Sequence, residues 1–516
     1  MTEASLTHVT GEPRPGEDGR PVDQTGAAQD PHHAKRWFVL AVIGLAQLMI
    51  VLDVTIVNIA LPDAQRDLGF SNGDRQWIVT AYSLAFGGLL LFGGRLADLI
   101  GRKRIFIIGL GLFAAASLLG GISPNFQVLV TARALQGAAG ALLAPAALSL
   151  LTTTFTDAKE RAKAFAVFGA IAGSGAAVGL LLGGLLTEYL TWRWTLFINV
   201  LLAVVALAGA LLFLKAKEVD ENERPSLDLP GTLLVTVGLF CVVYGFANAE
   251  SHPWSAPSTW AVLLIGAILL VGFCVSQVKT RNPLLPMRIV LDRDRGGSLL
   301  AMFITGAGMF GVFLFLTYYL QTSLAYSPVR TGLAFLPMVG ALMISATLAT
   351  TAVLPRVGPK WLVGPGMLAA AAGMAWLTGI SIHSSYTSNI LGPLLVIGAA
   401  LGLVFAPAMA SATFGVEPRD AGVASATVNA VQQVGGSIGT AVLNTIAVSA
   451  VTSFGLSHAK SGLSTTEIGA LAAVHSYTVA FWLCAGIFAV GSVIAFVLIR
   501  PGVQQADPGA DPMVHM

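Results

Sequence analysis

Two ionisable side chains lie deep inside long apolar runs of the sequence. Asp53 stands in the run near 37–60, and Arg133 stands in the run near 126–151. A charged side chain at such a depth in a membrane costs a few kcal/mol, so it faces a cavity, finds a partner or stays protonated. For Asp53 the natural hypothesis is proton carriage, in which the carboxyl group gains and loses a proton as its surroundings change.

The expected depths of Asp53 and Arg133 match. Asp53 lies about seven residues before the end of its run and Arg133 about seven residues after the start of its own, so at 1.5 Å per residue both lie roughly 10 Å below the same membrane boundary. The two side chains could therefore meet. Burial would favour the neutral acid and the guanidinium would favour the carboxylate, which leaves a balance that a conformational change can tip. The alternative is a static ion pair that holds two helices together.

A short basic segment, residues 94–104, separates two other apolar runs. Asp98 lies just before Gly101, where it can accept hydrogen bonds from the turn or from a helix N-terminus, and Arg102 can pair with an acid on a neighbouring element. Such contacts would latch one conformation. The alternative is that the basic residues only orient the chain in the membrane, which would leave Asp98 and the glycines unexplained.

Glycines recur at intervals of four in the run near 162–187, at Gly175, Gly179 and Gly183, with Gly184 adjacent. This spacing puts small residues on one face of a helix, so another helix can approach closely or slide past. A hinge or rocking contact is one interpretation, and ordinary small-residue packing is the other.

A substrate site is marked more weakly. Aromatic residues, methionines and a glutamine in the runs near 297–322 and 331–354 suit an adaptable pocket for apolar aromatic molecules. Such residues also face lipid or other helices in many membrane proteins. The candidate residues for a substrate cavity are Asn58, Gln136, Phe310, Tyr318 and Gln321.

The composition indicates which elements position these residues. Of 516 residues, 55% are hydrophobic and 11% are charged, whereas ordinary globular domains carry roughly 25% charged residues. Apolar runs of about 20 residues, the length that crosses a membrane, number about fourteen. They lie near 37–60, 76–95, 105–123, 126–151, 162–187, 194–214, 229–249, 259–278, 297–322, 331–354, 361–381, 389–413, 422–450 and 474–499. We therefore expect an all-α integral membrane protein.

Lysine and arginine are concentrated in alternate connections between these runs. The other set of connections offers little beyond Arg66, Arg75, Arg193, Arg330 and Lys460. The positive-inside rule then places both termini in the cytoplasm and the chain in the cytoplasmic membrane.

The remaining composition excludes several classes of function. A net charge of +2 is too small to indicate a nucleic-acid partner. The three cysteines lie in apolar runs, and no histidine stands near them at metal-ligand spacing. No phosphate-binding or nucleophile motif is present, so we expect no metal, no cofactor and no enzymatic activity.

An internal repeat indicates how the runs are grouped. The segment 140–145, Gly-Ala-Leu-Leu-Ala-Pro, is echoed by Gly-Leu-Val-Phe-Ala-Pro at 402–407. The two segments lie roughly 260 residues apart, which two similar six-helix halves separated by an insert would explain. The expected organisation is a disordered tail at 1–34, a six-helix bundle at 35–216, a linker with two extra helices at 217–282, a second six-helix bundle at 283–500, and a tail at 501–516.

Together these motifs resemble the major facilitator superfamily, and within it the fourteen-span drug:proton antiporters. The resemblance rests on Asp53 in its run, the segment 94–104, Arg133 to Gly137, the glycine series and Trp192-Arg193-Trp194. It implies two six-helix bundles, two extra linker helices and transport by alternating access. The chain departs from the family pattern because leucine, not proline, follows Gly179.

The resemblance also implies roles for the residues. Asp53 would carry the proton, Arg133 would assist coupling, and Gly94, Asp98, Gly101 and Arg102 would form the conformational latch. The expected function is proton-coupled efflux of lipophilic, often cationic, drugs or antibiotics by a monomer surrounded by membrane lipid. An uptake permease or uniporter on the same fold is the alternative.

Overall fold

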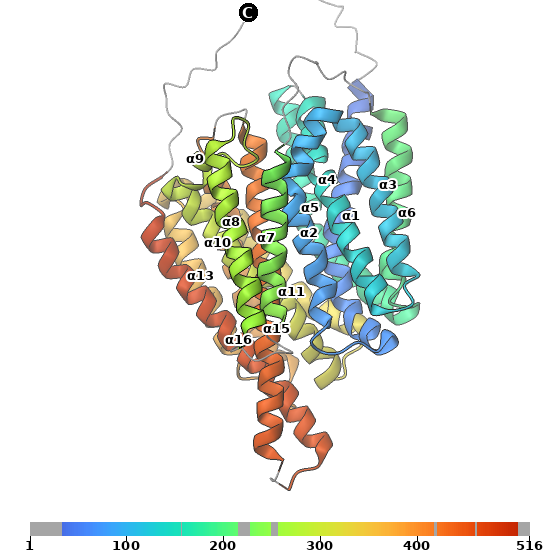
Figure 1. The fold of residues 1–516 in the computed structure, drawn as a ribbon, viewed down its shortest axis with the longest axis vertical. Helices are drawn as coiled ribbons and strands as arrows, with labels where there is room; N and C mark the ends of the chain where they lie inside the picture. Colours follow the sequence, from blue (N-terminus) through green and yellow to red (C-terminus); the bar gives the residue numbers. More distant parts are fainter. Residues whose placement is uncertain are drawn as a thin grey trace, which may run out of the picture.

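A computed structural model of the chain describes residues 33–155, 157–214, 228–248, 256–416, 420–459 and 462–503. The tails expected at 1–34 and 501–516 fall almost entirely outside the described residues. In the described ranges the regular elements are all helices (Figure 1). They are α1 (His33–Leu68), α2 (Arg75–Ile100), α3 (Arg102–Gly121), α4 (Phe126–Thr154), α5 (Ala158–Tyr189), α6 (Trp194–Phe213), α7 (Leu229–Asn248), α8 (Pro257–Lys279), α9 (Met287–Val290), α10 (Arg293–Tyr318), α11 (Pro328–Leu348), α12 (Leu354–Val357), α13 (Lys360–Leu377), α14 (Leu391–Thr413), α15 (Ala421–His458) and α16 (Thr465–Leu498).

Thirteen helical segments of the described chain are long and apolar enough to cross a membrane. The fourteenth expected run, near 361–381, corresponds to α13, an 18-residue helix that packs between α14 and α16. Three π-helical turns extend the helices of the second half: Tyr319–Ser323 after α10, Ala349–Val353 after α11 and Tyr386–Ile390 before α14. The predicted all-α membrane fold with about fourteen spans is confirmed.

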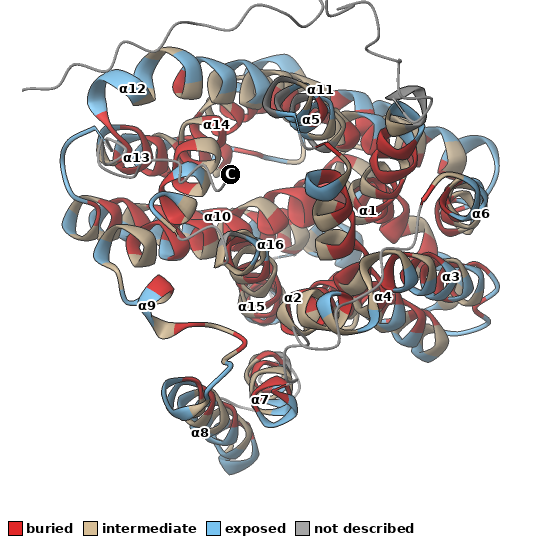
Figure 2. Ribbon diagram, turned by 90° about the horizontal axis from the view of Figure 1, so that it is seen from above, coloured by how far each residue is buried: buried red, intermediate tan, exposed pale blue. Residues whose placement is uncertain are grey.

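The helices form two groups and a separate pair. Helices α1 to α6 pack on one another, and so do α10 to α16. We call these groups the N-terminal half and the C-terminal half. Helices α7 and α8 pair with each other outside both halves, and α7 rests against α2 and α15 (Figure 2). The exact residue boundaries predicted for the domains stay a prediction.

The start of α1 and the end of α16 lie at the same end of the bundle, which we call the terminal end (Figure 1). Helix α15 has 38 residues and α16 has 34. At 1.5 Å per residue α15 is about 57 Å long, which exceeds a bilayer of roughly 40–45 Å. The hairpin of α15 and α16 accordingly extends beyond the other helices at the opposite end, which we call the distal end.

Local signals fix several helix ends. The side chain of Asn125 accepts a hydrogen bond from the Val128 amide at 3.0 Å and so caps α4. Helix α16 starts with a capping box between Ser464 and Glu467. Helix α2 ends at Ile100, and the next residue, Gly101, has a φ of 107°, which glycine adopts without strain. This glycine lets α3 begin at the very next residue.

Candidate functional site

The expected meeting of Asp53 and Arg133 is present in the structure. Arg133 Nη1 lies 2.6 Å from Asp53 Oδ2, and the two side chains are 2% and 0% exposed. The other carboxylate oxygen, Oδ1, accepts hydrogen bonds from Gln136 Nε2 at 3.0 Å and from Asn199 Nδ2 at 2.7 Å. The carboxylate thus has three donors from two other helices, and these donors offset part of the cost of burying a charge.

Arg133 is held on all sides as well. Its Nε donates to the carbonyl oxygen of Ile78 at 3.0 Å, and its Nη1 also donates to Gln136 Oε1 at 2.9 Å. The Tyr82 ring lies under the guanidinium, with its centroid 4.5 Å from Cζ. Gln136 Nε2 in turn donates to Ser117 Oγ at 2.8 Å.

The charged network therefore spans α1, α2, α3, α4 and α6, and it lies wholly inside the N-terminal half. Gly137 explains how α4 comes close enough to α2: a Cβ atom there would lie 2.2 Å from the Tyr82 carbonyl oxygen. Any larger residue would push the helices apart and move Arg133 away from the Tyr82 ring.

The network would keep polar partners around Arg133 even with Asp53 neutral. If Asp53 takes up a proton, Arg133 loses its counterion, and an unpaired guanidinium in a dry interior is costly. The Tyr82 ring, the Ile78 carbonyl and Gln136 still face the guanidinium in that state. Asn199 Oδ1 has no hydrogen-bond partner within the described ranges, so it is free to accept one from a protonated carboxyl group.

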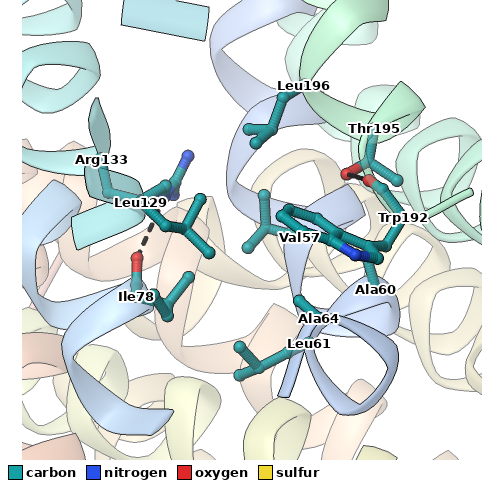
Figure 3. Close-up of a pocket in the computed structure, with 10 residues that line it drawn as sticks. All are labelled: Val57, Ala60, Leu61, Ala64, Ile78, Leu129, Arg133, Trp192, Thr195 and Leu196. Atoms are coloured by element: carbon teal, nitrogen blue, oxygen red, sulfur yellow. Dashed lines mark hydrogen bonds between the residues drawn. The ribbon is translucent and has the colours of Figure 1, made fainter. Parts of the chain in front are cut away.

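A small pocket lies beside Arg133, between α1, α2, α4 and α6. Figure 3 shows Arg133 and Leu129 on one side of it and Trp192 and Thr195 on the other. The pocket has room for about one water molecule. Drug-sized ligands need roughly 300–1,000 Å³, so this pocket is too small for a lipophilic cargo.

The two halves are joined by hydrogen bonds at the distal end. Tyr318 Oη donates to Gln65 Oε1 at 2.6 Å, and Gln321 Nε2 donates to the Ile59 carbonyl oxygen at 2.9 Å. The Val329 amide donates to Glu188 at 2.9 Å. Arg75 and Asn444, both buried, add a further bond of 3.0 Å. The distal end is therefore closed in this structure.

The predicted latch residues lie at the terminal end. Asp98 and Arg102 pair with each other at 3.6 Å, and both side chains are about 40% exposed. Arg95, which the sequence analysis did not single out, instead reaches the connection between α8 and α9, with Nη2 2.8 Å from the Pro283 carbonyl oxygen. A Cβ atom on Gly94 would lie 3.6 Å from Pro145, an ordinary contact. The role of these residues as a latch stays a prediction.

The tightest approach of α2 to α4 in this segment is made by the neighbouring residue, Gly93. A Cβ atom there would lie 2.1 Å from the Ala141 carbonyl oxygen. Sequence spacing gave no reason to choose Gly93 over Gly94.

The α5 glycines divide between two partners. Cβ atoms on Gly175, Gly179 and Gly183 would meet α1, and the contact of Gly179 with Thr55 Oγ1 would be 1.9 Å. Gly184 instead faces the C-terminal half, where a Cβ atom would lie 2.7 Å from Val329 Cα. The first three therefore pack α5 on α1, and only Gly184 lies in a contact between the halves. Their role as a hinge stays a prediction.

The candidate substrate residues do not lie together. Gln136 belongs to the charged network, while Tyr318 and Gln321 lie at the distal contact between the halves. Phe310 packs inside the C-terminal half, where its ring would meet a Cβ atom on Gly436 at 2.6 Å. Asn58 is buried on α1 and donates to the Val54 carbonyl oxygen. The pocket beside Arg133 is lined by none of the five.

Sequence reasoning missed several polar partners, which are Tyr82, Ser117, Asn199 and Asn444. Each lies in an apolar helix, and uncharged polar residues are common in such helices, so residue type alone did not distinguish them.

Asp, Glu, His and Cys side chains do not gather in groups of three that could hold a metal ion anywhere in the described ranges.

The ion pair makes a prediction about stability. Arg133→Met should leave the Asp53 carboxylate buried without its cation and destabilise the protein by about 3–5 kcal/mol. The double variant Arg133→Met with Asp53→Asn removes both charges, so most of that loss should return. Thermal unfolding in detergent of both variants and the unaltered protein measures this. Equal stability of the single and double variants would contradict the assigned pairing.

The sequence family described as Major Facilitator Superfamily matches residues 43–440. The puromycin resistance protein pur8 of Streptomyces alboniger is 48% identical over 486 residues, which cover 94% of this chain and 95% of the relative. The cephamycin export protein CmcT of Amycolatopsis lactamdurans is 37% identical, and the match covers 83% of this chain and 88% of the relative. The lincomycin resistance protein of Streptomyces lincolnensis is 34% identical, with the same coverage.

Solved structures support the fold alone. The POT family transporter PepTSo superposes with a TM-score of 0.66 at 13% identity, covering 90% of this chain and 98% of that one. A bacterial homolog of the human lysosomal transporter Spinster, inward-facing and unoccupied, superposes with a TM-score of 0.61 at 16% identity. The match covers 91% of this chain and 98% of that one.

Proposed function

This chain belongs to the Major Facilitator Superfamily, and from that premise we propose that it exports lipophilic small molecules, antibiotics among them, in exchange for protons. The observation that carries the proposal is the buried Asp53–Arg133 pair at 2.6 Å. It supplies an ionisable carboxyl group in the membrane-embedded part of the fold, which a proton antiporter requires. Three relatives named for antibiotic resistance or export support the class of cargo.

We infer that the terminal end faces the cytoplasm, because the basic connections gather there. On that assignment the closed distal end means that this conformation is not open to the outside, and the chain lies in the cytoplasmic membrane. Cargo would enter from the cytoplasm or the inner leaflet of the surrounding lipid. The halves would then rock, so that the distal contacts part and the terminal end closes.

The roles of individual residues follow from this cycle. Asp53 is protonated from the distal side and releases its proton to the cytoplasm, and Arg133 favours the release by stabilising the carboxylate. Asp98 and Arg102, exposed in this conformation, are free to contact the C-terminal half when the terminal end closes, with Gly94 and Gly101 shaping that segment. The chain acts as a monomer and as a carrier rather than an enzyme.

Export against a gradient tests the proposal. Puromycin is the first cargo to try, because the relative that is 48% identical is a puromycin resistance protein. Purified protein in liposomes should accumulate puromycin uphill when a pH gradient is imposed and should cease to do so when an ionophore collapses the gradient. Accumulation that only reaches equilibrium would favour a uniporter. In cells, the matching result is puromycin resistance in a susceptible host.

A further inference from the structure

A second buried arginine, Arg75, lies where the halves meet at the distal end. It is the first residue of α2 and is 4% exposed. Its Nε donates to Asn444 Oδ1 at 3.0 Å, and its Cζ lies 4.4 Å from the centroid of the Tyr318 ring. The Phe315 ring is also close, at 5.4 Å. No carboxylate in the described part of the chain forms an ion pair with Arg75.

The groups around this guanidinium belong to the other half of the molecule. Phe315 and Tyr318 stand one turn apart on α10, and Asn444 stands on α15. All three are buried, at 0%, 3% and 0% exposure. Tyr477 of α16 packs behind Phe315, with ring centroids 6.4 Å apart. Arg75 is thus the one member that the N-terminal half contributes.

The N-terminal half also fastens the rim of this site. Tyr318 Oη donates to Gln65 Oε1 at 2.6 Å, and Asn444 Nδ2 donates to the Gly73 carbonyl oxygen at 3.2 Å. When the halves part at the distal end, these bonds and the Arg75 contact must break together. The aromatic faces and the amide oxygen would then lie open on the C-terminal half.

The chemistry of the site is that of an organic-cation receptor. A buried guanidinium in a protein usually meets a carboxylate, but here it meets two aromatic rings and one amide oxygen. Aromatic faces attract cations and are the groups with which proteins bind guanidinium and quaternary ammonium ligands. The described site contains no carboxylate. A cation can therefore leave it without leaving a buried negative charge unpaired.

We propose that Phe315, Tyr318 and Asn444 form a binding site for organic cations, which Arg75 occupies while the distal end is closed. Separation of the halves at the distal end vacates the site. If the chain exports drugs, which this second step presumes, a cationic cargo takes the vacant site on its way out. The return of Arg75 on closure then displaces the cargo to the distal side.

The binding site is tested with purified protein and methylguanidinium chloride as the probe. Arg75→Ala leaves the site empty, so millimolar methylguanidinium should raise its unfolding temperature with saturation. In the unaltered protein the Arg75 guanidinium fills the site and competes with the probe as a tethered ligand. The same rise in unfolding temperature should therefore need at least about ten-fold more methylguanidinium. Adding Tyr318→Leu to Arg75→Ala should abolish the response.

A matched control exists at the same end. The exposed Arg330 lies over the Tyr326 ring at 3.8 Å, and both residues belong to the C-terminal half. Arg330→Ala should respond to methylguanidinium as the unaltered protein does. An equal response of Arg330→Ala and Arg75→Ala, or no saturable response in folded Arg75→Ala, would overturn the proposal.

A second variant keeps Arg75 in place in case its removal prevents folding. The added side chain of Gly184→Leu would meet the α11 backbone, because a Cβ atom there would lie 2.7 Å from Val329 Cα. The variant should hold the distal end open and therefore bind methylguanidinium although Arg75 is intact. Tyr318→Leu added to Gly184→Leu should remove that binding, and its persistence would refute the site. These measurements need neither a pH gradient nor export, so failure of the proposed transport function would leave their result unaffected.

Discussion

Replacing Asp53 with asparagine should abolish uphill export while leaving downhill exchange of cargo intact. Asparagine is close in size to aspartate and can still face Arg133, Gln136 and Asn199, but it cannot take up or release a proton. A pH gradient of one unit supplies about 1.4 kcal/mol per proton, which supports up to about ten-fold accumulation in a one-for-one exchange. The accumulation of puromycin that such a gradient drives in liposomes should therefore fall from about this ratio to none.

The same substitution elsewhere on α1 supplies the control. Asp63 lies ten residues further along the helix, where it pairs with the exposed Arg66 at the distal end. Asp63→Asn should retain gradient-driven accumulation, because a surface ion pair of this kind contributes little and is already in contact with water. If Asp53→Asn and Asp63→Asn transport equally well, Asp53 does not carry the proton.

Gly184→Leu should hold the distal end open and stop the transport cycle. A Cβ atom at this position would lie 2.7 Å from Val329 Cα and 2.8 Å from the Pro328 carbonyl oxygen, both backbone atoms of the other half. Overpacking of this kind costs about 1–3 kcal/mol, which shifts the conformational equilibrium by roughly 5- to 150-fold. Spin labels on exposed cysteines placed at Tyr189 and Arg330 should report a longer distance across the distal end.

Gly169→Leu is the matched control on the same helix. A Cβ atom on Gly169 would meet nothing within 4 Å, so the added side chain has space. This variant should keep both the short distal distance and the transport rate of the unaltered protein. A distal end that stays closed in Gly184→Leu would show that α5 and α11 can repack, and that this contact does not control opening.

Much of the fold was predictable because the membrane imposes one rule. Each span must be helical and about 20 residues long, so hydropathy alone located the helices. Hydropathy failed where helices continue beyond the bilayer. Helix α16 begins at Thr465, nine residues before the predicted run. The capping box at Ser464 and Glu467 is a local signal that would have placed this start.

The candidate site was predictable only in its charges. Asp53 and Arg133 stand out in apolar sequence, and their equal depths brought them together. Arg75 did not stand out, because it lies at the edge of an apolar run and its partner Asn444 is 369 residues away. Only the packing of α2 against α15 brings that pair together.

The candidate substrate residues show the limit of arguing from residue type. Phe310, Tyr318 and Gln321 are close in sequence, yet one lies in the core of its half and two bridge the halves. The direction in which a side chain points around its helix depends on neighbours that hydropathy does not reveal. In an aqueous protein an apolar stripe would indicate that direction, but in lipid most faces of a helix are apolar.

Proton movement during export tests the central claim most directly. Liposomes that contain the purified protein and a trapped pH indicator in weak buffer are given puromycin with no pH gradient imposed. The account predicts that protons move opposite to puromycin, so the pH of the lumen rises as puromycin enters. The Asp53→Asn variant should move puromycin without changing the pH of the lumen. Puromycin transport by the unaltered protein without any proton movement would contradict it.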